Sequence, residues 1–149
     1  MPGDWTIDTN VLYKAAEVDL PAVTFLLRIL EKKEPVNMDH ERRILKEYQN
    51  CLCESEKDRL GGIGVLKKWF KVIIDKHVQL RSGRLSRKQE NSLRKMGFHR
   101  DDWPFVGVCA RSDSRRLVTE DSDYTPEVRN YLGNEMSIRI LAVSETQNE

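Results

Sequence analysis

The chain has 149 residues, of which 39% are hydrophobic and 33% are charged, and its 25 Lys and Arg nearly balance its 24 Asp and Glu. This composition predicts one globular domain over residues 1–149, which can bury roughly 70% of the surface of its unfolded chain without disulfides or a structural metal. No apolar run approaches the roughly 20 residues of a membrane helix, and the first residues lack the basic and apolar segments of a signal peptide. We therefore expect a cytoplasmic protein, with no membrane partner, whose three cysteines are reduced.

Charged residues are unevenly distributed along the chain. Residues 76–100 contain eight basic residues and one acidic residue, whereas residues 101–149 contain ten acidic and five basic residues. A basic stretch beside an acidic one fits an enzyme that acts on a polyanion, because cations hold phosphates and carboxylates hold a metal ion. The alternative is that the basic stretch is only a solvated face.

The first part of the chain alternates between strand and helix patterns. Residues 4–8 form a short alternating segment that predicts a strand ending in Asp8, and residues 9–17 have the composition of a helix. Apolar residues recur at spacings of three and four over residues 20–33, which predicts a second helix. Residues 34–38 are predicted as a short second strand.

Three more helices are predicted in the middle of the chain. Asp39 is a suitable N-cap for a helix over residues 40–53, because its carboxylate can accept the free amide protons of the first turn. A glycine-rich break precedes an apolar helical stripe over residues 65–74. Residues 86–96 are predicted as a polar helix that begins at a Ser cap and ends at Gly97.

The last part of the chain contains two predicted strands and an apolar segment that fits either a helix or a strand. Residues 101–110 are apolar nearly throughout after an acidic start, which fits a buried helix or a buried strand. Strands are predicted at residues 117–119 and 137–144, and residues 145–149 are predicted as a flexible tail. Strands separated by helices indicate an α/β fold with a mainly parallel sheet, in which ligands bind at the carboxyl ends of the strands.

Several acidic residues are predicted to gather at that edge of the sheet. Asp8 and Asp121 each follow a predicted strand, and Asp123 lies two residues further along. Glu47 lies near the apolar stripe of its predicted helix, where a carboxylate is costly without a partner, and Asp102 begins the apolar segment. Such a cluster binds the hard cations Mg²⁺ or Mn²⁺ through carboxylate oxygens, and metal sites of this kind hydrolyse phosphodiesters.

Each acid also has a simpler explanation. Asp8 and Asp121 are of a type common in turns and caps, and Asp102 is suited to cap a helix. Glu47, at the margin of its stripe, can reach water or the neighbouring Lys46 and Arg43. Only the number of acids at one edge favours a metal site over these explanations.

Four segments resemble, in order, the motifs of PIN-domain nucleases. Residues 7–12 (Ile-Asp-Thr-Asn-Val-Leu) resemble the opening motif, in which an Asp at the end of the first strand is followed by Thr or Ser and often Asn. Residues 44–48 are similar to the segment with the family's helical Glu, and residues 102–107 to an Asp followed five positions later by a small residue. Residues 117–124 resemble the strand, Thr and paired acids that end the pattern, so the resemblance spans residues 4–143.

The resemblance implies a three-layer α/β/α sandwich around a mainly parallel sheet, and Mg²⁺- or Mn²⁺-dependent cleavage of single-stranded or structured RNA. The catalytic and metal-binding acids that it implies are Asp8, Glu47, Asp102 and Asp121. It makes Asp123 an auxiliary metal ligand, and gives Thr119 and Asn10 the task of positioning the acids. The residues of the basic stretch that it implies as RNA phosphate contacts are Arg81, Arg84, Arg87, Lys88, Arg94 and Lys95.

Two of these assignments have a rival nearby. Asp101 competes with Asp102, which we choose because only Asp102 has a small residue, Gly107, five positions further on. Glu41 competes with Glu47, but Glu41 lies near the N-terminus of its predicted helix, where the helix dipole accounts for an acid.

The resemblance leaves open two kinds of ribonuclease, a toxin with an antitoxin protein as its partner and an RNA-processing enzyme. The alternative is a catalytically silent RNA- or protein-binding module, which the number of acids disfavours because like charges repel. A metal-dependent phosphatase is also disfavoured, because Asn10 stands where its second Asp is required. The apolar face formed by Val65, Trp69 and Ile73 is either core or the interface of a homodimer.

Overall fold

The centre of the molecule is a set of short parallel strands. The computed structural model describes residues 3–149, so residues 1–2 of the predicted domain lie outside the described residues. The strands are β1 (Thr6–Ile7), β2 (Val36–Asp39), β3 (Val78–Arg81), β4 (Arg116–Val118) and β5 (Arg139–Leu141). β4 pairs with β1 and with β5, and β2 pairs with β3, all in parallel.

A backbone bridge between Trp5 and Val36 joins the two groups of strands. The Trp5 amide donates to the Pro35 carbonyl at 2.9 Å, and the Asn37 amide donates to the Trp5 carbonyl at 2.8 Å. The strands therefore follow the order β3-β2-β1-β4-β5. The predicted α/β class with a mainly parallel sheet is confirmed.

The path of the chain through the sheet reverses between β1 and β4. From β1 the chain adds β2 and β3 on one side, and it then returns to add β4 and β5 on the other side. In open parallel sheets, ligands bind in the crevice beyond the carboxyl ends of the two strands that flank such a reversal. Because Ile7 pairs with Val118, the residues that follow them, Asp8 and Thr119, meet at this edge of the sheet.

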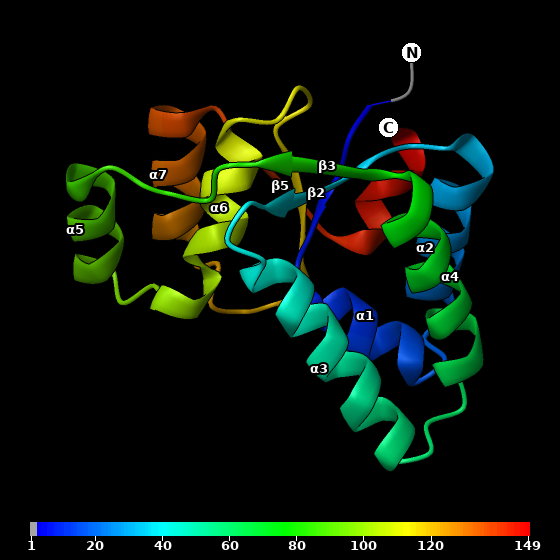
Figure 1. Cartoon of the computed structure of the whole chain (residues 1–149). Coiled ribbons are helices and arrows are strands. Elements are labelled where there is room, and N and C mark those ends of the chain that lie inside the picture. Colours follow the sequence, from blue (N-terminus) through cyan, green and yellow to red (C-terminus); the bar gives the residue numbers. More distant parts are fainter. Residues whose placement is uncertain (1–2) are drawn as a thin grey trace.

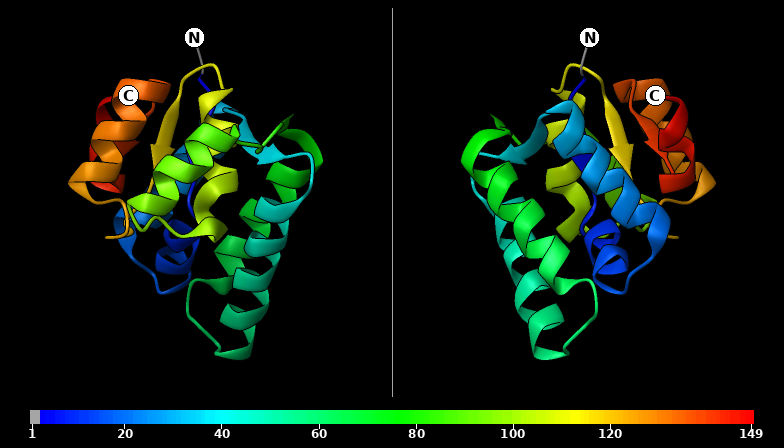
Figure 2. Two further views of the ribbon diagram at one scale, coloured as in Figure 1. Left: turned by 90° about the vertical axis from the view of Figure 1, so that its left-hand side faces the viewer. Right: turned by 90° about the vertical axis from the view of Figure 1, so that its right-hand side faces the viewer.

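Helices surround the strands and extend beyond them (Figure 1). They are α1 (Thr9–Ala16), α2 (Leu20–Lys32), α3 (Arg43–Lys57), α4 (Ile63–Lys76), α5 (Arg87–Lys95), α6 (Trp103–Ala110) and α7 (Pro126–Met136), with 3-10 turns η1 (Arg100–Asp102) and η2 (Val143–Asn148). α6 packs across β1, β2 and β4, α1 to α4 pack against one another, and α7 packs against β5. Both views of Figure 2 show α3 and α4 projecting together from the molecule.

The apolar face of α4 belongs mainly to the core. Trp69 and Ile73 are fully buried, and Val65, which was predicted on the same face, remains 42% exposed. Trp103 is also buried, as expected for a core aromatic residue, and Phe70 is partly buried against the core. Trp69 and Ile73 are therefore not available for a homodimer interface.

The predicted helices α1, α2, α4 and α5 are confirmed, but α3 begins later than predicted. Asp39 ends β2, and its carboxylate accepts hydrogen bonds from the amides of Arg43 at 3.0 Å and Ile44 at 2.8 Å. The carboxylate therefore holds the first turn of α3 as a cap does, with the helix starting at Arg43 rather than at residue 40. The sequence left helix and strand open for the apolar segment at residues 101–110, and its residues 103–110 form the helix α6.

Two elements, β3 and α7, were not predicted. β3 is a sheet edge whose four residues, Val-Gln-Leu-Arg, alternate between apolar and polar, but the segment is short and its side chains are half-buried or exposed, and this signal was not used. α7 does carry a start signal, because the Thr125 hydroxyl accepts the Val128 amide at 3.3 Å and Pro126 is its first residue.

The C-terminal residues do not form the flexible tail expected for 145–149. They fold into η2, where Thr146 is 1% exposed and its carbonyl accepts a hydrogen bond from Arg28 at 3.2 Å. Glu149 accepts a hydrogen bond from Arg139 at 2.8 Å. The short polar sequence gives no sign of these contacts, because both partners lie on other elements.

The described residues contain no helix with both the length and the apolarity to cross a membrane. The three cysteines, Cys51, Cys53 and Cys109, are all free thiols. Cys51 and Cys109 are buried, whereas Cys53 is exposed. The expectation of reduced cysteines therefore agrees with the structure.

A contact between two glycines fixes the loop after β3 against α6. A Cβ atom at Gly107 would overlap the Gly83 carbonyl oxygen, and a Cβ at Gly83 would lie 3.1 Å from the Asp39 Cβ. The Arg111 guanidinium holds the same loop by donating to the carbonyls of Ser82 at 3.1 Å and Arg84 at 2.6 Å. The small residue five positions after Asp102 is thus required by packing.

We expect Gly107→Ala to lower the free energy of unfolding by about 2 kcal/mol, because the new methyl group must displace backbone rather than a flexible side chain. Gly133→Ala is the matched control, since Gly133 also lies inside a helix, but a Cβ added there would be 3.8 Å from its nearest neighbour, the Ile138 carbonyl oxygen. The control should be neutral or up to about 1 kcal/mol more stable. Urea unfolding measures both, and equal stability of the two variants would contradict the packing role of Gly107.

Candidate metal centre

Three carboxylates converge at the edge of the sheet where its direction reverses. Asp8, Asp102 and Asp121 each offer an oxygen, and these oxygens all lie within 4.8 Å of one another. Asp8 follows β1, Asp121 follows β4, and Asp102 precedes the first residue of α6, so three distant parts of the chain build the group. We call these residues the acidic triad.

Two members of the triad lie at helix N-termini without capping them. Asp8 is at the N-cap position of α1 and Asp102 at that of α6, yet neither carboxylate accepts a capping hydrogen bond from its helix. The helix dipoles favour negative charge at these positions without occupying the carboxylate oxygens. Asp102 therefore stands at the N-cap position, as the capping explanation requires, but its carboxylate does not act as a cap.

A hydroxyl group connects the two strands beneath the triad. The Thr119 hydroxyl donates to Asp8 Oδ2 at 2.7 Å and accepts the amide of Asp121 at 3.0 Å. The Asn10 side chain spans the same gap, since its amide donates to Thr119 Oγ1 at 3.5 Å and its carbonyl accepts the Glu120 amide at 3.3 Å. Thr119 thus contacts Asp8 and Asp121 directly, and Asn10 contacts Thr119 and the backbone of Glu120. Their role in positioning the acids stays a prediction.

Asp123 lies beside the triad rather than in it. It is exposed, and its amide donates to Asp121 Oδ1 at 2.9 Å, which orients that carboxylate. The negative charge of Asp123 also contributes to raising the pKa of Asp8 and of Asp102. Its position fits an auxiliary acid at the outer rim of the site.

Burial and mutual repulsion raise the pKa of the clustered acids. Burial, followed by the charge of Asp121 and opposed by the Thr119 hydrogen bond, raises the pKa of Asp8 from 3.8 to about 6. Burial and then the charges of Asp8 and Asp121 raise the pKa of Asp102 from 3.8 to about 7. Burial and then the charge of Asp8 raise the pKa of Glu47 from 4.5 to about 7. The charged forms of these acids are thus destabilised by their surroundings.

The two rival acids have ordinary explanations. Glu41 is paired with Arg84 at 3.2 Å, and its own backbone amide, with Arg84, lowers its pKa. Asp101 is 79% exposed and lies 3.5 Å from His99. Asp102 is the one that joins the triad, and Glu47 is half-buried beside it without being one of its three members.

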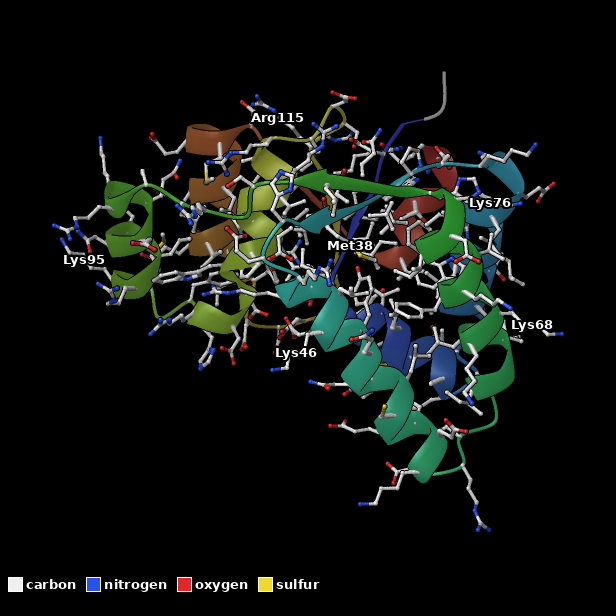
Figure 3. All side chains as sticks on the ribbon, in the orientation of Figure 1. Met38, Lys46, Lys68, Lys76, Lys95 and Arg115 are labelled. Atoms are coloured by element: carbon white, nitrogen blue, oxygen red, sulfur yellow. The ribbon has the colours of Figure 1, made fainter. Side chains whose placement is uncertain are left out.

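A cleft of about 610 Å³ adjoins this cluster of acids. Glu47 and Asp101 line it together with Asn50, Pro104 and three basic residues. The basic residues are Arg43, Lys46 and Arg100, and in the described part of the chain none of them pairs with an acid. Figure 3 shows Lys46 at the exposed surface of α3. We call this space the basic cleft.

The residues of the basic cleft were not among the predicted RNA contacts. The available signal was the spacing of Arg43, Lys46 and Glu47, which puts two bases within one helical turn of the acid. Arg100 belongs to the basic stretch of the sequence but directly precedes Asp101 and Asp102. Its place beside α3 becomes visible only in the folded chain.

One predicted phosphate contact, Arg81, has a structural role instead. Its side chain is 22% exposed and donates to Asn37 at 3.2 Å, to the Arg111 carbonyl at 2.9 Å and to Asp4 at 3.2 Å. These partners lie around the end of β3, the strand that the sequence did not reveal. Arg81 is therefore not free to bind phosphate.

The other predicted contacts are exposed at or near α5. Arg84 pairs with Glu41, and the Arg94 guanidinium lies 5.7 Å from the centre of the Trp103 ring. Arg87, Lys88 and Lys95 are exposed, and Figure 3 shows Lys95 pointing away from the molecule. These residues form a basic surface on α5, and they stay predicted RNA contacts.

In metal-free protein we expect the melting temperature to rise by several degrees when the pH is lowered from 8 to about 5. The pKa values of Asp8, Glu47 and Asp102 lie above their ordinary values, so between about pH 4 and 7 the folded state binds more protons than the unfolded state. The free energy of unfolding therefore falls as the pH rises through this window. Thermal denaturation over this range of pH, with chelator present, measures the change in melting temperature.

Two variants and the addition of Mn²⁺ test the origin of this pH dependence. Asp8→Asn should raise the stability at pH 8 and weaken the pH dependence, whereas Asp75→Asn, at an exposed acid of α4, should leave it unchanged. Saturating Mn²⁺ should stabilise the protein at pH 8, by about 2.7 kcal/mol at one hundred times its dissociation constant. Stability that is flat or rising between pH 5 and 8 in chelator would show that the acids do not repel one another as described.

Comparisons of the chain with known protein families, with curated proteins and with solved structures give no match. The function must therefore be argued from the geometry of the triad, the basic cleft and their surroundings.

Proposed function

We propose that the protein is a Mg²⁺- or Mn²⁺-dependent endoribonuclease that hydrolyses RNA phosphodiester bonds at the acidic triad. The observation that carries this proposal is that Asp8, Asp102 and Asp121 converge within 4.8 Å with no cationic side chain paired to them in the described residues. A cleft lined by unpaired cations lies directly beside this group. Carboxylates that hold a metal and cations that hold phosphates are what metal-dependent cleavage of a polyanion requires.

The donor set of the triad fits a hard divalent cation. All three side chains offer carboxylate oxygens, which Mg²⁺ and Mn²⁺ prefer over nitrogen or sulfur. Neither Asp8 nor Asp102 uses its oxygens to cap a helix, so those oxygens face the common space. When bound, the metal ion supplies an activated water and neutralises charge on the leaving oxygen.

The chain's own residues hold this arrangement and handle the substrate. Thr119 fixes one oxygen of Asp8 and leaves the other available. Glu47 lines the basic cleft, and its charge acts on Asp102 of the triad, so it is the acid placed to assist proton transfer beside the triad. Arg43, Lys46 and Arg100 bind phosphates of the strand next to the cleaved bond, and the basic surface on α5 extends that contact.

We also infer a three-layer α/β/α arrangement of the PIN type. Crossovers between parallel strands are right-handed, so α1 to α4, which precede β2 and β3, belong on one face of the sheet. The chain then reverses its direction, which assigns α5, α6 and α7 to the other face. The packing of α6 across β1, β2 and β4 supports this assignment.

The test is cleavage of a mixed pool of labelled single-stranded RNAs in Mn²⁺ or Mg²⁺, with chelator in parallel. We expect metal-dependent cleavage that falls by at least roughly 100-fold in Asp8→Asn and in Asp121→Asn, and by roughly 10- to 100-fold in Thr119→Ala, because Thr119 positions Asp8 and the backbone of Asp121. Asp75→Asn, at an exposed acid of α4, should cleave as the unaltered protein does.

Circular dichroism of every variant separates loss of activity from loss of fold. RNA binding without cleavage, at equal strength in all variants, would overturn the nuclease proposal and favour a binding module. Cleavage that survives chelation or both Asp→Asn substitutions would place the chemistry elsewhere.

A further inference from the structure

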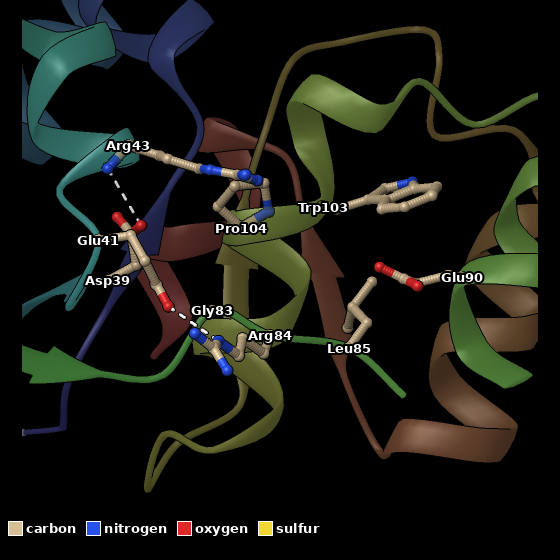
Figure 4. A pocket seen from close by; sticks show the side chains of 9 residues that line it. All are labelled: Asp39, Glu41, Arg43, Gly83, Arg84, Leu85, Glu90, Trp103 and Pro104. Atoms are coloured by element: carbon tan, nitrogen blue, oxygen red, sulfur yellow. Dashed lines mark hydrogen bonds and ion pairs between the residues drawn. The ribbon is translucent and has the colours of Figure 1, made fainter. Parts of the chain in front are cut away.

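A second cleft, of about 320 Å³, continues from the basic cleft. Arg43 and Pro104 line both spaces, so the second cleft is reached from the triad by passing the first turn of α6. Its other walls come from the loop after β3, from α5 and from Trp103 (Figure 4). Its volume is near the lower limit for pockets that hold small organic molecules, which suits a group of the size of a nucleobase.

The walls of this cleft combine apolar surface with one uncommitted carboxylate. Leu85, Trp103 and Pro104 supply the apolar surface. Glu41 is already paired with Arg84, and the Asp39 oxygens already accept two backbone amides. In Figure 4 the Glu90 side chain points from α5 toward Trp103 and Leu85.

Glu90 is the carboxylate of the cleft that has no partner in the part of the chain that the structure describes. Among the described residues, no side chain or amide donates to its carboxylate, although it is only half-exposed. An ionised carboxylate only accepts hydrogen bonds, so a ligand that binds Glu90 must present donors. The cleft combines three apolar side chains with five charged ones, and its apolar wall beside this acceptor suits a flat molecule with two adjacent N–H groups.

The cleft is held in shape by the contact between α6 and the loop after β3. Gly107 packs on Gly83, and Arg111 binds the carbonyls of Ser82 and Arg84. This contact fixes the backbone that carries Leu85 relative to Trp103. The space is therefore part of the folded structure rather than a gap between mobile side chains.

We infer that this cleft binds a guanine base of a single-stranded RNA whose neighbouring phosphate lies in the basic cleft. The inference rests on the proposed ribonuclease function, and it adds the strandedness and base preference of the substrate. Guanine presents N1–H and the N2 amino group side by side, which together satisfy both oxygens of Glu90. Adenine and cytosine place a ring-nitrogen acceptor beside their amino group, and uracil has a single N–H between two carbonyls.

A base inside a duplex cannot enter this cleft. Its donor edge is already paired and its faces are stacked, whereas unpaired bases can turn out and be read on that edge by protein side chains. The basic residues Arg43 and Lys46 beside the triad and Glu90 in the second cleft thus offer phosphate contacts next to one base contact.

The test measures binding in chelator, so that its result does not depend on cleavage. Fluorescence anisotropy compares labelled hexanucleotides of uridine with hexanucleotides in which alternate residues are guanosine, adenosine or cytidine. We expect the guanosine oligomer to bind about tenfold tighter than the other three, and Glu90→Gln to reduce this preference to below about threefold. Glu127→Gln is the matched control, because Glu127 is likewise an acid in the first turn of a helix but lies in α7.

A second measurement locates the base. Guanosine monophosphate should shift the indole N–H resonance of Trp103, assigned with Trp103→Phe, and adenosine monophosphate should not. Equal binding of all four oligomers would overturn the guanine cleft and leave the nuclease proposal to its own cleavage test. Guanine preference without metal-dependent cleavage would retain the cleft and overturn the nuclease. Binding of guanosine monophosphate but of no RNA would overturn the inference in favour of a free nucleotide, and an unaltered preference in Glu90→Gln would contradict the assigned contact.

Discussion

The repulsion among carboxylates at the edge of the sheet is the constraint on which the rest of the site depends. Asp8, Asp102 and Asp121 are held within 4.8 Å by the pairing of β1 with β4 and by the start of α6. These are elements of the core, so the acids cannot move apart without disturbing it. Their charge is not compensated by any described cationic side chain. The repulsion therefore lowers the stability of the folded protein when these acids are charged.

The cations of the chain fall into two groups with different tasks. Arg81 and Arg111 donate hydrogen bonds to carbonyls and carboxylates of the protein, and these bonds hold loops in place. Among the described residues, no acceptor pairs with the side chains of Arg43, Lys46 and Arg100, which line the cleft beside the acids. Counting charges along the sequence treats the two groups alike. Only the acceptors around each side chain, which come from other elements, separate a structural arginine from one that is free to bind phosphate.

Sequence reasoning found the acids because their positions follow from local rules. An Asp at or shortly after the end of a parallel strand lies near the carboxyl edge, so the strand pattern predicted this edge for Asp8, directly after β1, and for Asp121, three residues after β4. Asp102 was chosen over Asp101 because a small residue, Gly107, lies five positions after it. The contact between Gly107 and Gly83 explains why a small residue is required there. The edge strand β3, the helix α7 and the basic cleft escaped prediction. The basic cleft depends on contacts between distant segments, whereas the alternation of β3 and the start signal of α7 were present in the sequence and not used.

Two aspartates that flank β1 show why the triad is not an ordinary buried group. Asp4 and Asp8 are equally buried, at 3% exposure each. Burial acts to raise the pKa of Asp4, but hydrogen bonds from Ser114 and Asp113 and the charge of Arg81 outweigh it, so the pKa is lowered. At Asp8, burial prevails over the hydrogen bond from Thr119, and the pKa rises to about 6. The fold thus gives Asp4 two backbone amides and a guanidinium, whereas the charge of Asp8 is opposed by burial and by the negative charges of Asp121 and Asp123, against a hydroxyl and the Thr9 amide.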